Sequence, residues 1–162
     1  MLKRVHIIGL GLMGTNLGIK LVNGGIQVSG DDILEKNIIR AKELGALSLE
    51  HKNSINYDLI ILAMPINEII GYFDDSPGIN SKAIVDLGGT KELICKKMDL
   101  SPIPSIGGHP LCGIADNNTW EPSPQIYEQA PFLLCETDST DEQSKAIVSE
   151  FIKCIESKEI WI

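Results

Sequence analysis

Short, nearly continuous apolar runs alternate along the chain with segments whose apolar residues recur at helical spacing. The first run covers residues 4–8, stops at a glycine and is followed by an amphipathic stretch from Leu12 to Val22. Short apolar runs bounded by glycine are typical of buried strands, whereas apolar residues spaced three and four apart are typical of helices. The pattern therefore predicts a strand, a tight turn and a helix at the start of the chain.

The same alternation continues to the last residue. Further strands are expected at 26–30, 46–49, 58–63, 82–86, 132–135 and 158–162, and helices at 33–44, 67–73, 91–98 and 141–157. Residues 58–63 are almost all apolar, as in a parallel strand that is covered on both faces. Residues 101–124 are rich in proline and glycine and are expected to be irregular. Strands that alternate with helices predict an α/β fold of Rossmann type, a doubly wound, mostly parallel sheet in a single domain, 1–162.

Length, charge and cysteine usage narrow the class of protein. A chain of 162 residues suits one domain, and its net charge of −8 argues against nucleic acid and against anionic membrane surfaces as partners. The longest apolar run, Leu59–Ile66, is too short to cross a bilayer. The spacing of the four cysteines fits neither a zinc site nor a disulfide framework, so we expect no metal, reduced thiols and a cytoplasmic location. These cysteines are Cys95, Cys112, Cys135 and Cys154.

The first turn carries the spacing G-x-G-x-x-G between the first strand and the first helix. Gly9 permits the tight turn, Gly11 lets the backbone approach a pyrophosphate, and Gly14 lets the helix pack closely on the strand. The free N–H groups at the start of the helix favour an anion. We therefore expect a dinucleotide here; the alternative is a glycine turn that only closes a strand–helix unit. The residues expected to bind this cofactor are Gly9, Leu10, Gly11, Leu12, Met13 and Gly14.

An acidic residue follows at the distance that a dinucleotide site requires. Asp32 lies eighteen residues after Gly14, at the end of the second expected strand. A carboxylate there accepts hydrogen bonds from the adenosine ribose and repels a 2′-phosphate, which favours NAD over NADP. Asp31 is the alternative ribose ligand, and an ordinary Asx turn is the structural alternative. The turns after later strands should border the nicotinamide half of the cofactor, through Ala63, Met64, Pro65 and Gly88.

His109 is the candidate catalytic residue. Two glycines precede it and a proline follows, in the irregular stretch that we expect at the same edge of the sheet. Histidine titrates near neutral pH and can take a hydroxyl proton as a hydride leaves the same substrate. The alternative is a loop histidine that binds backbone groups. His6, inside the first strand, and His51, in a polar stretch, are expected to be structural.

Three motifs together resemble the prephenate and arogenate dehydrogenases of tyrosine biosynthesis. The turn reads IIGLGLMGTNLG, and VDLGGTKELI is similar to the family's (T/V)D-x-G-S-V-K. GGHPLCG followed by IYEQAPFLLCETDST is similar to GGHPMAG followed by LFENAPYVLTPTE. The resemblance covers essentially all 162 residues, and its histidine motif is more specific than its glycine motif.

The resemblance implies an NAD-dependent oxidative decarboxylation of prephenate or arogenate. His109 would then polarise the ring hydroxyl of this small-molecule substrate, and Asp32 would hold the cofactor. Substrate contacts would come from Thr90, Gly108 and Pro110. Family members also carry a second, mostly helical domain, which supplies a dimer interface and an arginine for the substrate carboxylate. We expect residues 1–162 to lack that domain, and therefore expect a homo-oligomer or a partner domain to cover apolar surface near the C-terminal end.

Two departures from the family pattern leave other functions open. Gly89 stands where the family has serine, so that Thr90 carries the nearest hydroxyl, and residues 114–118 replace a polar segment of the family. A non-catalytic NAD-binding sensor or docking module is therefore one alternative. A dehydrogenase of the β-hydroxyacid type, which shares the N-terminal motif, is another.

Overall fold

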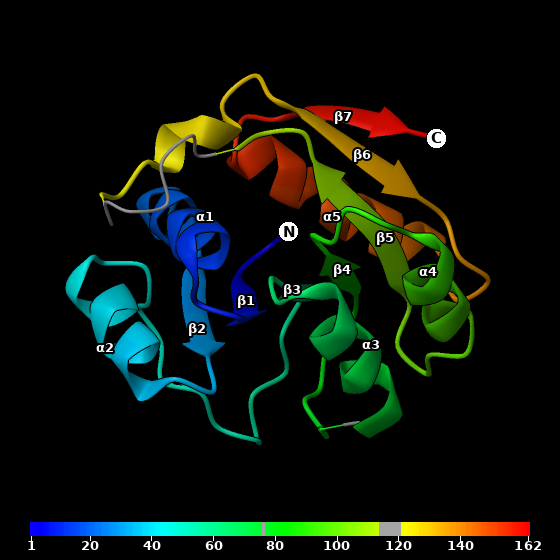
Figure 1. The fold of residues 1–162 in the computed structure, drawn as a ribbon, viewed down its shortest axis with the longest axis horizontal. Helices are drawn as coiled ribbons and strands as arrows, with labels where there is room; N and C mark the ends of the chain where they lie inside the picture. The colour runs from blue at the N-terminus through cyan, green and yellow to red at the C-terminus, as the bar shows by residue number, and fades with distance from the viewer. Residues whose placement is uncertain (76, 114–120) are drawn as a thin grey trace.

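The computed structural model describes residues 1–75, 77–113 and 121–162, which form one sheet with helices on both faces (Figure 1). Within these residues the sheet has seven strands in the order β2-β1-β3-β4-β5-β6-β7. The strands are β1 (Arg4–Ile8), β2 (Gln27–Asp31), β3 (Leu59–Leu62), β4 (Ile84–Asp86), β5 (Ser105–Pro110), β6 (Pro131–Cys135) and β7 (Lys158–Trp161). The helices are α1 (Leu12–Asn23), α2 (Glu35–Glu43), α3 (Ile66–Asp75), α4 (Glu92–Asp99), the 3-10 turn η1 (Pro124–Tyr127) and α5 (Glu142–Cys154).

The five strands β2, β1, β3, β4 and β5 are parallel, and the chain changes direction after β5. β6 runs antiparallel to β5, and β7 runs parallel to β6. The register places Ile8, Leu62 and Asp86 side by side at the carboxyl ends of β1, β3 and β4. Ligands bind at this edge in open α/β sheets. The predicted doubly wound, mostly parallel Rossmann-type fold is confirmed.

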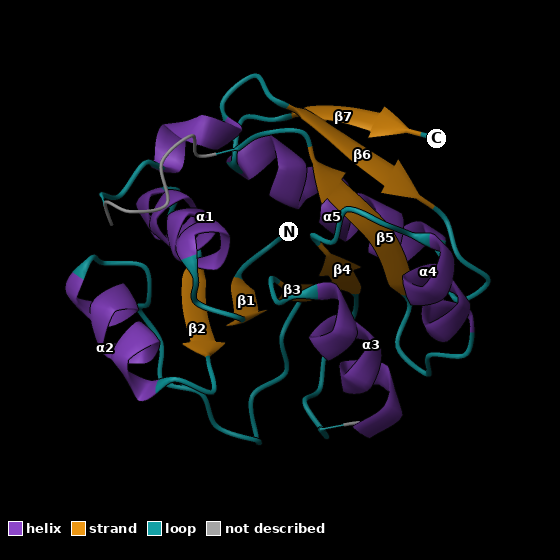
Figure 2. Ribbon diagram, in the orientation of Figure 1, coloured by secondary structure: helices purple, strands orange, loops and turns teal. Residues whose placement is uncertain are grey.

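Helices cover both faces of the sheet (Figure 2), and an apolar cluster packs them against each face. One face packs α1 and α5 against the strands, with Leu17 and Phe151 fully buried. The other face packs α3 and α4, with Ile69 and Met98 fully buried. All four residues of β3, Leu59–Leu62, are buried because helices cover both of its faces.

The strand expected at residues 46–49 is wrong. This segment has no strand geometry, although it follows the edge strand β2. The amides of Ser48 and Leu49 both donate to one carbonyl, that of Val28, at 2.8 and 2.9 Å. A strand ladder spreads its bonds over alternate residues of the partner, so two bonds to one carbonyl mark a turn across the edge.

The expectation that residues 101–124 are irregular throughout is also wrong, because β5 lies within them and carries His109. Gly107 and Gly108 made this segment look like a loop, yet both sit inside the sheet. A Cβ on Gly108 would clash with the carbonyl oxygen of Asp86, and one on Gly107 would lie 2.5 Å from Sγ of Cys135. Close packing rather than a turn therefore requires these glycines.

Candidate functional site

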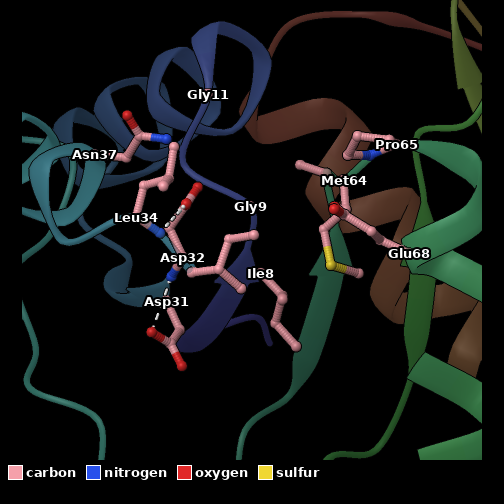
Figure 3. A pocket seen from close by; sticks show the side chains of 12 residues that line it. Ile8, Gly9, Gly11, Asp31, Asp32, Leu34, Asn37, Met64, Pro65 and Glu68 are labelled. Atoms are coloured by element: carbon pink, nitrogen blue, oxygen red, sulfur yellow. Dashed lines mark hydrogen bonds between the residues drawn. The ribbon is translucent and has the colours of Figure 1, made fainter. Parts of the chain in front are cut away.

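A cavity of about 420 Å³ lies at the carboxyl edge of the sheet, between the first turn and the turn after β3 (Figure 3). Gly9 and Gly11 line it on one side, and Met64 and Pro65 line it on the other. Its size falls within the range of small-molecule and cofactor sites. The sequence-predicted cofactor residues that line it are Gly9, Gly11, Asp32, Ala63, Met64 and Pro65.

The three motif glycines are required for different reasons. Gly9 has a φ of +99°, and its Cβ would clash with the carbonyl of Ala63. Gly14 packs its Cα against the carbonyl of Gly9, so the fold excludes any side chain there too. Gly11 differs from both, because its φ of −72° suits any residue and a Cβ there would meet nothing within 4 Å. Beyond its place at the N-cap of α1, glycine at position 11 is therefore required neither by φ nor by packing, and it opens onto the cavity.

Asp32 lies half-buried at the end of β2 and is tied to the glycine turn. Its Oδ2 accepts from the amide of Leu10 at 2.8 Å, and its Oδ1 accepts from the amide of Leu34 at 2.8 Å. The second bond closes an Asx-type turn. Each carboxylate oxygen can accept a further bond, so the side chain can serve the turn and a ligand together. Asp31 also lines the cavity, but it is exposed and caps the amide of Asp32 at 2.9 Å.

His109 lies near the carboxyl end of β5, three strands along the same edge from the glycine turn. At ~4.8 Å per strand, that separation is about 14 Å. Its ring stands over Gly89, where a Cβ would lie 3.6 Å from Cε1, and it lines a second cavity of about 110 Å³ with Leu133 and Ile162. Nδ1 of His109 is buried and has no hydrogen-bond partner among the described residues.

A buried ion pair supports the strand ends on which His109 rests. Asp86, the last residue of β4, is fully buried and pairs with Nζ of Lys91. Its carboxylate also accepts from the amides of Gly88 at 2.8 Å and Gly108 at 2.9 Å. Burial raises the pKa of Asp86, and the Lys91 ammonium and the two amides oppose that rise. The pair thus links the turn after β4 to the residue before His109.

The remaining predicted residues lie outside the first cavity. Leu10 is buried in the turn, and the carbonyl of Met13 accepts a hydrogen bond from the Tyr127 hydroxyl at 2.9 Å. Gly88 is buried, with the side chain of Ile94 close to its Cα. Leu12 begins α1, Thr90 is exposed in the turn before α4, and Pro110 is buried at the end of β5 beside His109. The polar segment 114–118 and Trp120 lie outside the described residues.

The prediction missed several residues of the site. Asp86 and Lys91 stand within a predicted motif without a predicted role, although an acid that ends an apolar strand, five residues before a lysine, is a usable signal. Two apolar residues that line the cavity but were not predicted as site residues, Ile33 and Leu34, follow Asp32 directly. Both are strongly exposed, and exposed apolar residues beside an expected ribose site were also a signal.

Comparison with known proteins agrees with this geometry. Residues 17–160 match the family described as "Prephenate dehydrogenase, nucleotide-binding domain". The prephenate dehydrogenase of Lactococcus lactis is 31% identical over 166 aligned residues, which cover 93% of this chain and 46% of that protein. The prephenate dehydrogenase of Bacillus subtilis is 25% identical, with 92% and 43% covered. The chain therefore spans less than half of the length of these relatives.

Solved structures show the same fold. Prephenate dehydrogenase from Aquifex aeolicus, in complex with hydroxyphenyl propionate and NAD+, superposes with a TM-score of 0.87 at 21% identity, covering 100% of this chain and 60% of that one. Synechocystis arogenate dehydrogenase superposes with a TM-score of 0.81 at 22% identity, covering 98% and 59%. No helix in the described residues is long and apolar enough to cross a membrane. By its sequence match over residues 17–160, the chain belongs to the prephenate dehydrogenase family and corresponds to its nucleotide-binding domain.

Proposed function

We propose that this chain is the NAD-binding domain of a cytoplasmic prephenate or arogenate dehydrogenase and supplies its catalytic histidine. The reaction is the oxidative decarboxylation that leads to tyrosine. Family membership supports this reaction class, and the arrangement of the glycine turn, Asp32 and His109 along one sheet edge supports the division of labour. The Aquifex relative was crystallised with NAD+ and a hydroxyphenyl compound, which are ligands of these chemical classes.

The observation that carries the cofactor assignment is Gly11. Its backbone is ordinary and its surroundings are open, so the fold would accept alanine. A pyrophosphate that lies against the start of α1 would not, because a methyl group would separate it from the backbone N–H groups. The cavity therefore fits a dinucleotide, with Asp32 positioned for the ribose and Ile33 and Leu34 for the adenine.

We assign the polarisation of the substrate hydroxyl to His109. NAD, when bound, supplies a hydride acceptor. His109 hydrogen-bonds the ring hydroxyl and polarises it as the hydrogen on the same ring carbon departs with its electron pair. The carboxylate on the opposite ring carbon leaves as carbon dioxide, its bonding electrons completing the aromatic ring. Nδ1 of His109 has no partner among the described residues, which supports a role for the imidazole beyond the fold. Thr90, Gly108 and Pro110 remain our proposed substrate contacts.

The apolar edge of the sheet supports a further partner surface. Among the described strands β7 pairs only with β6, and its residues Ile160 and Trp161 are 40% and 37% exposed. Ile162 is 74% exposed. An edge strand with exposed apolar side chains favours association, so we propose that a second copy or a further domain covers it. Sedimentation that gives a monomer at all concentrations would contradict self-association.

The cofactor proposal is tested by a pair of glycine substitutions. Gly71 on α3 is matched to Gly11, because a Cβ there also meets nothing within 4 Å and its φ is not positive. We expect Gly11→Ala to weaken NAD binding, measured by calorimetry, by about tenfold or more, a change of about 1.4 kcal/mol. Gly71→Ala should bind NAD as the parent does and melt at or above the parent temperature, and Gly11→Ala, at the N-cap of α1, should remain folded and melt within about 5 °C of the parent.

Equal NAD affinities of the two variants, or no NAD binding by the parent, would contradict the proposal. Turnover is followed by NADH formation with prephenate and with arogenate, alone and with a candidate second domain added. Tight NAD binding without turnover under all these conditions would favour a non-catalytic sensor or docking module. Turnover of other hydroxy acids alone would favour the β-hydroxyacid class.

A further inference from the structure

Two cysteines that are far apart in the sequence meet behind the His109 cavity. Cys95 lies on α4 and Cys135 ends β6, forty residues later, and their sulfur atoms are 3.4 Å apart. Both are free and half-buried, as are Cys112 and Cys154. Among the described residues, Cys95 and Cys135 are the pair of thiols in direct contact.

Gly107 makes room for this contact. It faces Cys135 in the β5–β6 register, and a Cβ at this position would lie 2.5 Å from Sγ of Cys135 and 3.0 Å from Sγ of Cys95. Any side chain on Gly107 would therefore push the two sulfurs apart. The close approach depends on a strand glycine at the point where both thiols meet the sheet.

The two thiols differ in access to the cavity. Cys135 lines the 110 Å³ cavity with His109, whereas Cys95 lies behind it on α4. Burial, reinforced by the neighbouring sulfur of Cys135, raises the pKa of Cys95 to about 12. Cys95 is therefore a thiol at neutral pH, and Cys135 is the sulfur that a small oxidant in the cavity meets first.

We propose that Cys95 and Cys135 form a redox site that a small peroxide converts to an intramolecular disulfide. The Cys135 sulfur, as its thiolate, attacks one oxygen of the peroxide, the O–O bond breaks, and Cys135 becomes a sulfenic acid as water leaves. The Cys95 sulfur then attacks the Cys135 sulfur, the S–O bond breaks, and a second water carries away the Cys95 proton. Two thiols are oxidised by two electrons, and one hydrogen peroxide is reduced to two waters.

Only a small movement separates the thiols from the bonded state. The sulfur atoms must approach from 3.4 Å to the disulfide distance of about 2.05 Å. That movement draws α4 toward β6. The amide of Cys95 donates to the carbonyl of Lys91 at 2.8 Å, and Lys91 pairs with Asp86, which binds the amide of Gly108. Disulfide formation should therefore shift Gly108, the residue that precedes His109, through these contacts.

The test treats the purified protein with hydrogen peroxide and counts thiols before and after. We expect the loss of two thiols, a tryptic peptide pair that joins Cys95 to Cys135, and recovery with dithiothreitol. The chain-entropy effect of closing a forty-residue loop should raise the melting temperature by about 5 °C or more. The imidazole NMR signals of His109 should shift on oxidation, whereas those of the distant His51 should not.

Matched variants decide between this pair and the other cysteines. The double variant Cys112→Ser/Cys154→Ser should behave as the parent does. Cys95→Ser should stop at a sulfenic acid on Cys135, which dimedone traps, and should form no internal disulfide. Retention of all four thiols, a link that involves Cys112 or Cys154, or dimers linked between chains would overturn the proposal. Oxidation that leaves the His109 signals unmoved would overturn its coupling to the catalytic cavity.

Discussion

His6 and His109 occupy strands of the same sheet, and each keeps one buried ring nitrogen without a partner in the described part of the chain, Nε2 in His6 and Nδ1 in His109. Their surroundings differ. His6, on β1, is fully buried, and burial together with the nearby ring of His51 lowers its pKa to about 3. His109 is half-exposed at a cavity on the carboxyl edge. An unpartnered nitrogen therefore does not distinguish the proposed catalytic histidine from the buried one, whereas exposure of the residue at a cavity does.

The other nitrogen of His6 belongs to a chain of hydrogen bonds that runs through Ser29 and Tyr57 to His51. Ser29 donates to the Tyr57 hydroxyl at 2.8 Å, so Nδ1 of His6 must donate to Ser29 Oγ, 2.7 Å away. The Tyr57 hydroxyl also hydrogen-bonds Nδ1 of His51 at 2.8 Å. Burial lowers the pKa of His6, and its ring packs against the rings of His51 and Tyr57. The structural role expected for His6 and His51 fits this arrangement.

The largest expected effect separates the two histidines by activity. His109→Asn should lower kcat by about 10²–10⁴-fold, because a general acid–base contribution is lost, while the melting temperature changes little. His6→Asn should do the reverse, lowering the melting temperature and leaving kcat of the folded fraction unchanged. NADH formation and thermal unfolding of both variants provide the measurements. Equal losses of kcat in both variants would remove the distinction.

The next effect concerns pH and stability. Because the pKa of His6 is about 3 when folded and about 6.5 when unfolded, the unfolded chain binds a proton between these values that the folded chain does not. The contribution of His6 is fully present above about pH 6.5 and declines as the pH falls, by about 1.4 kcal/mol per pH unit. Urea unfolding of the parent and of His6→Leu at pH 7 and pH 4.5 isolates this term. Parallel losses in both proteins would show that His6 does not titrate as expected.

The smallest effect removes one link of the network. Tyr57→Phe deletes the hydroxyl between Ser29 and His51 and leaves the Ser29 donor without its acceptor, which should cost about 1–2 kcal/mol of unfolding free energy. NAD affinity should be unchanged, because Tyr57 does not line the cofactor cavity. Tyr72→Phe is the control for loss of a phenol elsewhere. A changed NAD affinity in Tyr57→Phe alone would show that the network reaches the cofactor site.

The parts of the fold that the sequence predicted well are those determined by local pattern. β1, α1 and β2 follow from an apolar run, a glycine turn and a helical repeat within 31 residues. The pattern does not predict β5, because its glycines are required by close packing against Asp86 and Cys135. These two residues belong to other strands, so a local stretch of sequence does not indicate the contacts.

The residues of the site divide in the same way, into those that local spacing predicts and those that only tertiary packing brings together. Gly9, Gly11 and Asp32 could be predicted because the backbone chemistry of a dinucleotide turn has a fixed spacing, and the structure does bring them to one cavity. The Asp86–Lys91 pair and the contact of Cys95 with its partner thiol depend on tertiary packing. The two thiols are far apart in the sequence, and the packing of α4 against the sheet brings them into contact.

Gly11 also has a consequence for natural variation. Most positions in a folded domain are held by several constraints at once, so their retention does not say which constraint acts. At Gly11 neither backbone conformation nor packing opposes a side chain. A lineage that stopped using the nucleotide could replace this residue without losing its fold, while Gly9 and Gly14 would persist. The identity of the residue at position 11 would then tell whether a homologue still uses its nucleotide, independently of whether it still folds.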